Sequence, residues 1–92
     1  MFKLGELYIT NGIDNYMKQG FEHQKEIITA FSRYKCMDWS DTCDSDKALN
    51  DSAVKNNDDR ILAKYLLSDG KEIFIITEYD RSATTILFCS EY

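Results

Sequence analysis

The 92-residue sequence has no proline, only four glycines and no long apolar run. Without proline, no turn has its φ angle fixed by a ring. No segment approaches the roughly 20 apolar residues that a membrane-spanning helix needs, and no basic stretch followed by an apolar one opens the chain. We therefore expect a soluble cytoplasmic protein that is not exported by a classical signal peptide and has no membrane partner.

Cysteine and histidine are also scarce. Cys36, Cys43 and Cys89 are an odd number of cysteines without close spacing, and His23 is the only histidine. A disulfide framework and a closed zinc site both need more paired ligands than this, so the sequence predicts reduced thiols and no metal. There is also no glycine-rich phosphate loop and no nucleophile motif, so we expect no cofactor and no enzymatic activity.

One cluster near the C-terminus is a secondary candidate site. Glu78, Asp80 and Arg81 lie close together in the sequence, and with Asp38 and Asp41 they would supply oxygen ligands for magnesium. Their spacing matches no metal-binding motif. The favoured interpretation is a capped turn in which Arg81 pairs with a nearby carboxylate.

The residues that are present predict a single α+β domain over residues 1–92. Apolar residues make up 43% of the chain and aromatic residues 13%, which is enough for one core. Periodicity and turn signals give the order β-α-α-α-β-β-β, in which a probable N-terminal strand and two to three helices accompany three C-terminal strands. The expected strands are 6–10, 60–67, 73–76 and 84–89, and the expected helices lie near 13–17, 21–34 and 45–56.

The C-terminal strands are expected to form an antiparallel sheet. Asp69-Gly70 is a strong signal for a two-residue hairpin loop, which places Leu66 opposite Ile73 and Tyr65 opposite Phe74. Both faces of the strand Ile73–Ile76 are apolar, so we expect this strand to be central. Three short helices are too few to cover both faces, and the sequence therefore predicts a partly open sheet face that would allow a homodimer.

The net charge of −5 is concentrated in one segment. Residues 38–59 contain seven acidic residues and two lysines, so they carry the whole imbalance, while the rest of the chain is neutral. With no basic patch, direct nucleic-acid binding is disfavoured and a basic partner protein is favoured. The expected partner-binding residues are Asp38, Trp39, Asp41, Asp44, Asp46, Asp51, Asp58 and Asp59.

Two features of this segment have a structural as well as a functional interpretation. Trp39 is the only tryptophan, and it either plugs the edge of the core, which is slightly favoured, or anchors a partner within a ring of charge. The apolar side of the third helix is thin and consists of Ala48, Leu49, Ala53 and Val54. This helix is expected to leave its acidic residues in water.

Several short motifs together resemble a family of small, mostly uncharacterised "plasmid-related" accessory proteins from plasmids, integrative elements and phages of low-GC bacteria. The resemblance covers nearly the whole chain and brings no catalytic assignment. Ser40 stands where the family pattern has glycine. The motifs are Asp38-Trp39, Asp46-Lys-Ala-Leu-Asn-Asp51, Arg60-Ile-Leu, Asp69-Gly70, Ile75-Ile-Thr-Glu78, Asp80-Arg-Ser82, Thr84-Thr-Ile-Leu-Phe88 and Glu91-Tyr92.

The resemblance implies an accessory role on mobile DNA in a bacterial host cell. Accessory proteins of this size often inhibit host defence, so the resemblance favours an anti-CRISPR or anti-restriction inhibitor whose acidic surface occupies the nucleic-acid groove of a CRISPR effector or restriction nuclease. The alternatives are a structural or regulatory homodimer and, with less support, a small metal-dependent enzyme.

Overall fold

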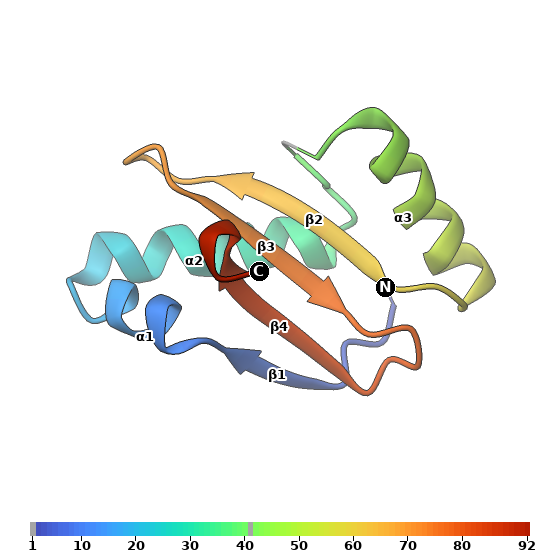
Figure 1. Ribbon diagram of the computed structural model, residues 1–92, viewed down its shortest axis with the longest axis horizontal. Helices are drawn as coiled ribbons and strands as arrows, with labels where there is room; N and C mark the ends of the chain where they lie inside the picture. The colour runs from blue at the N-terminus through green and yellow to red at the C-terminus, as the bar shows by residue number, and fades with distance from the viewer. Residues whose placement is uncertain (1, 41) are drawn as a thin grey trace.

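The computed structural model describes residues 2–40 and 42–92, and within them three helices pack on a four-stranded mixed sheet (Figure 1). The strand order across the sheet is β1-β4-β3-β2. Both the α+β class and the predicted element order are confirmed. The elements are β1 (Glu6–Ile9), α1 (Asn11–Met17), α2 (Phe21–Lys35), α3 (Asp44–Asn56), β2 (Ile61–Leu66), β3 (Glu72–Thr77), β4 (Ala83–Phe88) and a short 3-10 helix η1 (Cys89–Glu91).

The sheet is mixed rather than purely antiparallel. The strands β2, β3 and β4 form an antiparallel meander, as expected, but β1 lies parallel to β4 at the far side. A parallel neighbour requires a long connection, and here the chain between β1 and β4 contains all three helices and two strands. The strand β3 has β4 on one side and β2 on the other, so its predicted central position is confirmed.

The predicted register of the β2–β3 hairpin is wrong by one residue. Tyr65 lies opposite Ile73 rather than Phe74, and Leu66 lies opposite Glu72. The amide N–H of Leu67 donates to Lys71 O at 2.8 Å, so the loop has three residues, 68–70, instead of two. Only Gly70 in this loop has a positive φ, +89°, whereas the expected two-residue turn needs positive φ at both loop positions.

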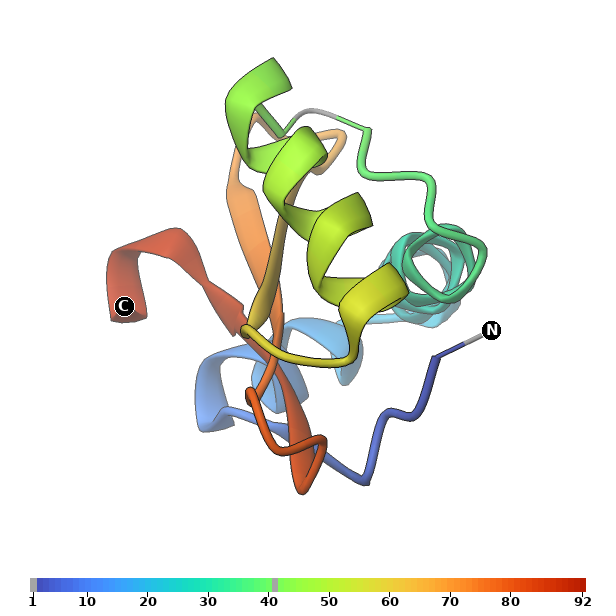
Figure 2. The same ribbon diagram turned by 90° about the vertical axis from the view of Figure 1, so that its right-hand side faces the viewer.

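The helices α2 and α3 pack on one sheet face, which we call the core face (Figure 2). The inward side of α2 contributes Ile27, Ala30 and Tyr34 to the core, and α1 adds Ile13 and Tyr16. The corrected register places the opposing apolar residues on the same side of the sheet. From the strands, Ile61, Ala63, Tyr65, Ile73, Ile75 and Ile86 belong to this core.

The opposite sheet face carries no helix other than η1, within the described residues. Tyr92, which follows η1, packs edge-on against Phe74 with ring centroids 5.3 Å apart. Ile76 and Leu87 on this face are buried, while Leu66 is exposed. The face is therefore covered at its centre and open at its margin.

Two helices bury different residues from those expected. On α2, the apolar spacing of Phe21, Ile27, Ile28, Phe31 and Tyr34 predicts one buried stripe, but Phe21 and Ile28 are exposed. On α3, Leu49 is 61% exposed and the polar Asn50 is buried in its place next to Ala53. The inward side of α3 is rotated relative to the prediction because Asn50 has a specific polar partner in the sheet.

Candidate protein-binding surface on the acidic helix

The described residues of the acidic segment 38–59 form α3 and the loops beside it, and α3 flanks the β2 side of the sheet (Figures 1 and 2). The helix has 13 residues and is therefore about 20 Å long. The residue that follows it, Asn57, has left-handed backbone angles, as is common after the last helical turn. The helix thus displays its outward side along one margin of the molecule.

The inward side of α3 is fixed by hydrogen bonds to the outer edge of β2. The side-chain amide of Asn50 donates to Leu62 O at 2.8 Å and accepts from Leu62 N–H at 3.1 Å. In the preceding loop, the hydroxyl oxygen of Thr42 accepts from Lys64 N–H at 2.8 Å. Asn50 and Thr42 are both buried, and together they occupy backbone groups that would otherwise be an open sheet edge.

The helix α3 and its C-terminal turn carry five carboxylates that form no ion pair with another described residue. In residues 2–40 and 42–92, no lysine or arginine nitrogen is found within 4 Å of the carboxylate oxygens of five residues, whereas Asp14, Asp38, Asp69 and Glu72 all form ion pairs. The predicted site residue Asp41 lies outside the described residues. We call the five residues the acidic surface: Asp44, Asp46, Asp51, Asp58 and Asp59.

Part of this acidity has a structural role. Asp44 and Asp46 lie in the first turn of α3, where the helix dipole favours negative charge. Asp58 and Asp59 lie beyond the opposite end, where the dipole disfavours negative charge, and each accepts the backbone N–H of the following residue, at 2.7 and 2.8 Å. Asparagine would make the same turn contacts, so the turn itself does not require the charge at Asp58 and Asp59.

Asp38 and Trp39 are placed differently from the rest of the predicted site. The Arg33 guanidinium donates to Asp38 at 2.8 Å and lowers the pKa of that carboxyl below its usual value. Trp39 is only 4% exposed, packs edge-on against Tyr34, and donates its indole N–H to Asp51 at 2.8 Å. Of the two interpretations of Trp39, its position matches the core plug, and we omit it from the acidic surface.

The secondary cluster at the β3–β4 turn is organised around a buried arginine. Arg81 is 7% exposed, and its guanidinium donates to Asp59 O at 2.7 Å and to Ala53 O at 2.8 Å. It therefore caps the C-terminal end of α3 through backbone carbonyls, whereas the sequence predicted a carboxylate partner. Asp80 accepts the Ser82 N–H at 3.0 Å, and the Ser82 contacts lower the Asp80 pKa, while Glu78 is exposed.

A shallow groove of about 240 Å³ lies between α3 and β2 and contains residues that the sequence did not single out. Leu49, at its outer side, is a large exposed apolar side chain, and Asp46 and Asp59 line the same groove. Arg60 lies in the groove as well and donates to the Tyr92 hydroxyl at 2.8 Å. Leu49 is thus an exposed apolar side chain beside carboxylates. One of the two interpretations of the sequence gave this role to Trp39.

Comparisons with protein-family models, curated proteins and solved structures found no match to this chain. In the described part of the chain, no group of three or more histidine, cysteine, aspartate or glutamate side chains is arranged to hold a metal ion. No helix there is both long and apolar enough to cross a membrane. The acidic surface and the groove beside it are therefore the features of the described residues that bear on function.

Proposed function

We propose that this protein binds a basic partner protein through the acidic surface and Leu49. The observation that carries the proposal is that Leu49, 61% exposed, lies in a groove with Asp46 and Asp59, within an acidic surface whose five described carboxylates form no ion pair within 4 Å. Interfaces commonly combine an apolar anchor with a charged rim. A partner with lysines or arginines around an apolar pocket would complement this surface.

The charge distribution favours fast, salt-sensitive association. Residues 38–59 carry the whole net charge of −5, so the field of the molecule is strongest on the side of α3. Exposed charges act over about 8–10 Å at physiological ionic strength. Binding through this surface should weaken steeply as salt is added, which separates it from an interface dominated by apolar burial.

Within this class, the partner we favour is a CRISPR effector or a restriction nuclease of the bacterial host. Such nucleases hold nucleic acid in basic grooves, and carboxylates spread along the roughly 20 Å of α3 suit occupation of a groove of that kind. The further support is the resemblance of the sequence motifs to accessory proteins of mobile DNA. The protein then acts as an anti-CRISPR or anti-restriction inhibitor.

The test is inhibition of DNA cleavage by purified CRISPR effectors and restriction nucleases, with native protein and a triple variant. The variant Asp44→Asn, Asp58→Asn, Asp59→Asn keeps the size and turn contacts of each side chain. Because exposed charge pairs contribute about 0.2–1 kcal/mol each, loss of three of them should raise the inhibitory concentration about 3- to 150-fold.

The matched control removes the same number of charges elsewhere on the surface, by Asp14→Asn, Glu22→Gln and Asp69→Asn. It should inhibit as the native protein does, because these residues lie outside the acidic segment. Equal effects of the two triple variants would show that only net charge matters and would overturn the assignment to α3. Absence of inhibition of every nuclease tested would overturn the inhibitor class.

A further inference from the structure

The two edges of the sheet differ in whether their outward backbone groups are hydrogen-bonded. At the β2 edge, Asn50 and Thr42 hydrogen-bond the outward backbone groups of Leu62 and Lys64. At the β1 edge, no such bonding is found among residues 2–40 and 42–92. The chain therefore protects one edge of its sheet from strand pairing and leaves the other available.

The backbone of β1 presents a defined set of groups to solvent. The amides of Glu6 and Thr10 donate to Ser82 O and Ile86 O of the β4 segment, at 3.1 and 3.2 Å. Because alternate residues of a parallel ladder bond to the same neighbour, the N–H and C=O groups of Leu7 and Ile9 point away from the sheet. The side chains are exposed too: Leu7 by 49%, Tyr8 by 51% and Ile9 by 41%.

We infer that β1 pairs antiparallel with β1 of a second copy, so that two sheets of four strands join across a two-fold axis. In this register Leu7 faces Ile9 of the other copy, Glu6 faces its Thr10, and Tyr8 lies on the axis. Each Leu7–Ile9 pair exchanges two backbone hydrogen bonds, which makes four for the dimer. The interface brings apolar side chains together and keeps the two Glu6 carboxylates apart.

Other registers use fewer of the outward groups. Centring the axis on Leu7 would place Ile9 opposite Gly5, whose φ of +65° departs from an extended strand. Centring it on Ile9 would place Leu7 opposite Asn11, which already belongs to α1. Each of these registers forms one bonded pair instead of two. A shift by one residue would oppose outward groups with groups already bonded to β4.

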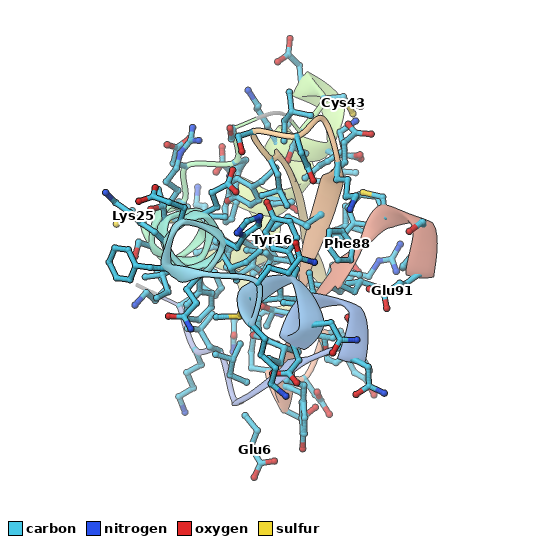
Figure 3. The ribbon with its side chains drawn as sticks, turned by 90° about the vertical axis from the view of Figure 1, so that its left-hand side faces the viewer. Glu6, Tyr16, Lys25, Cys43, Phe88 and Glu91 are labelled. Atoms are coloured by element: carbon cyan, nitrogen blue, oxygen red, sulfur yellow. The ribbon has the colours of Figure 1, made fainter. Side chains whose placement is uncertain are left out.

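The charge distribution favours a second copy on this edge in particular. Residues 2–37 contain five basic and four acidic residues, so the chain around β1 is close to neutral. The acidic segment lies beyond β2, three strand spacings or about 14 Å across the sheet. In Figure 3, Glu6 at one margin and Cys43, just before α3, at the opposite margin mark this separation. Pairing through β1 therefore keeps the two acidic segments away from each other.

This inference is independent of the proposed function, because it uses the opposite edge of the sheet. The paired edge is only four residues long, so the interface is small and the dimer is weak. A weak dimer is best tested by a covalent cross-link that forms only in the expected register. Tyr8 provides one, since side chains facing each other across a non-hydrogen-bonded pair have Cα atoms about 4.5 Å apart, within the range that a disulfide spans.

The experiment introduces Tyr8→Cys into a chain whose three natural cysteines are changed to serine. Mild oxidation at about 0.1–1 mM protein is expected to give a covalent dimer. Glu6→Cys in the same background is the matched control, because Glu6 faces Thr10 of the second copy and should not cross-link efficiently. A monomeric Tyr8→Cys protein, or equal cross-linking of both variants, would overturn the register.

Sedimentation of the protein with its natural cysteines tests the edge itself. Dimer is expected to form with rising concentration and to be lost in Ile9→Lys, since a charged residue on an edge strand opposes pairing. Ile28→Lys, which changes an exposed isoleucine of α2, should leave the dimer intact. A native protein that stays monomeric at about 1 mM would overturn the inference. So would dimerisation that Ile9→Lys leaves unchanged and Leu66→Lys abolishes, because it would assign the interface to the open sheet face.

Discussion

Replacing Arg81 by alanine is expected to lower the free energy of unfolding by about 3–5 kcal/mol. The Arg81 guanidinium is buried between the end of α3 and the β3–β4 turn, where it donates to the carbonyls of Ala53 and Asp59. Alanine removes both donors and leaves the carbonyls without a replacement. The end of α3 and the turn then lose the group that joins them.

The magnitude follows from the contacts. Hydrogen bonds from a charged group contribute about 1.5–3 kcal/mol each, and two of the Arg81 contacts are 2.8 Å or shorter. Backbone conformation adds a second, separable effect, because Arg81 has a φ of +61°. A left-handed conformation costs a residue with a side chain about 1–2 kcal/mol relative to glycine. Arg81→Gly should therefore destabilise less than Arg81→Ala by about that amount.

Urea unfolding followed by circular dichroism measures these differences, with stability obtained by linear extrapolation. Arg60→Ala is the matched control, because Arg60 is an exposed arginine with a surface contact to the Tyr92 hydroxyl, and it should change stability by less than about 0.5 kcal/mol. The reasoning would be refuted if Arg81→Met, which keeps the bulk of the side chain without its donors, unfolded at the same urea concentration as the native protein.

Three further predictions concern contacts that fix the fold around the site. Asn50→Ala should cost about 2 kcal/mol and accelerate exchange of the Leu62 amide, since both backbone groups of Leu62 lose their partner; unchanged exchange would contradict the edge-capping role. Glu26 accepts the Tyr16 hydroxyl at 2.6 Å, which lowers the Glu26 pKa below its usual 4.5, so its contribution is complete above that pH and is lost as pH falls through the lowered value. In Glu26→Gln the free energy of unfolding should therefore depend less on pH in the acid range. An unaltered pH dependence would count against the contact. Trp39→Ala should cost about 3–5 kcal/mol while partner binding per folded molecule is retained; loss of binding with stability retained would restore Trp39 as an anchor.

The fold was predictable from the sequence where local signals and burial agree. The helix α1 and the apolar run of β3 both lie where their patterns indicated. The hairpin register was not predictable from Asp69-Gly70 alone. The same dipeptide serves a two-residue loop and a three-residue loop with glycine last, and packing against the core decides between them.

The candidate site was predictable as a segment but not residue by residue. Charge counting located residues 38–59, and this segment forms one helix with its flanking loops. The apolar periodicity of the helix predicted that Leu49 is buried, because apolar side chains are expected on the inward side. In the structure Asn50 takes the inward position, since its amide matches both backbone groups of Leu62. Such a match depends on a strand that lies 12 residues further along the chain.

The orientation of α3 links the acidic surface to the edge of the sheet. Asn50 and Thr42 fix one side of the helix and its preceding loop on β2, and this leaves Leu49, Asp44 and Asp51 exposed. A single orientation of α3 about its axis therefore has two effects. It prevents strand pairing at β2, and it exposes charged side chains to solvent. Asn50→Ala allows that rotation to relax and should weaken partner binding, although Asn50 itself is buried and cannot contact a partner. If binding survives in Asn50→Ala and is lost only when carboxylates are removed, charge alone recognises the partner and the rotation of α3 is not needed for it.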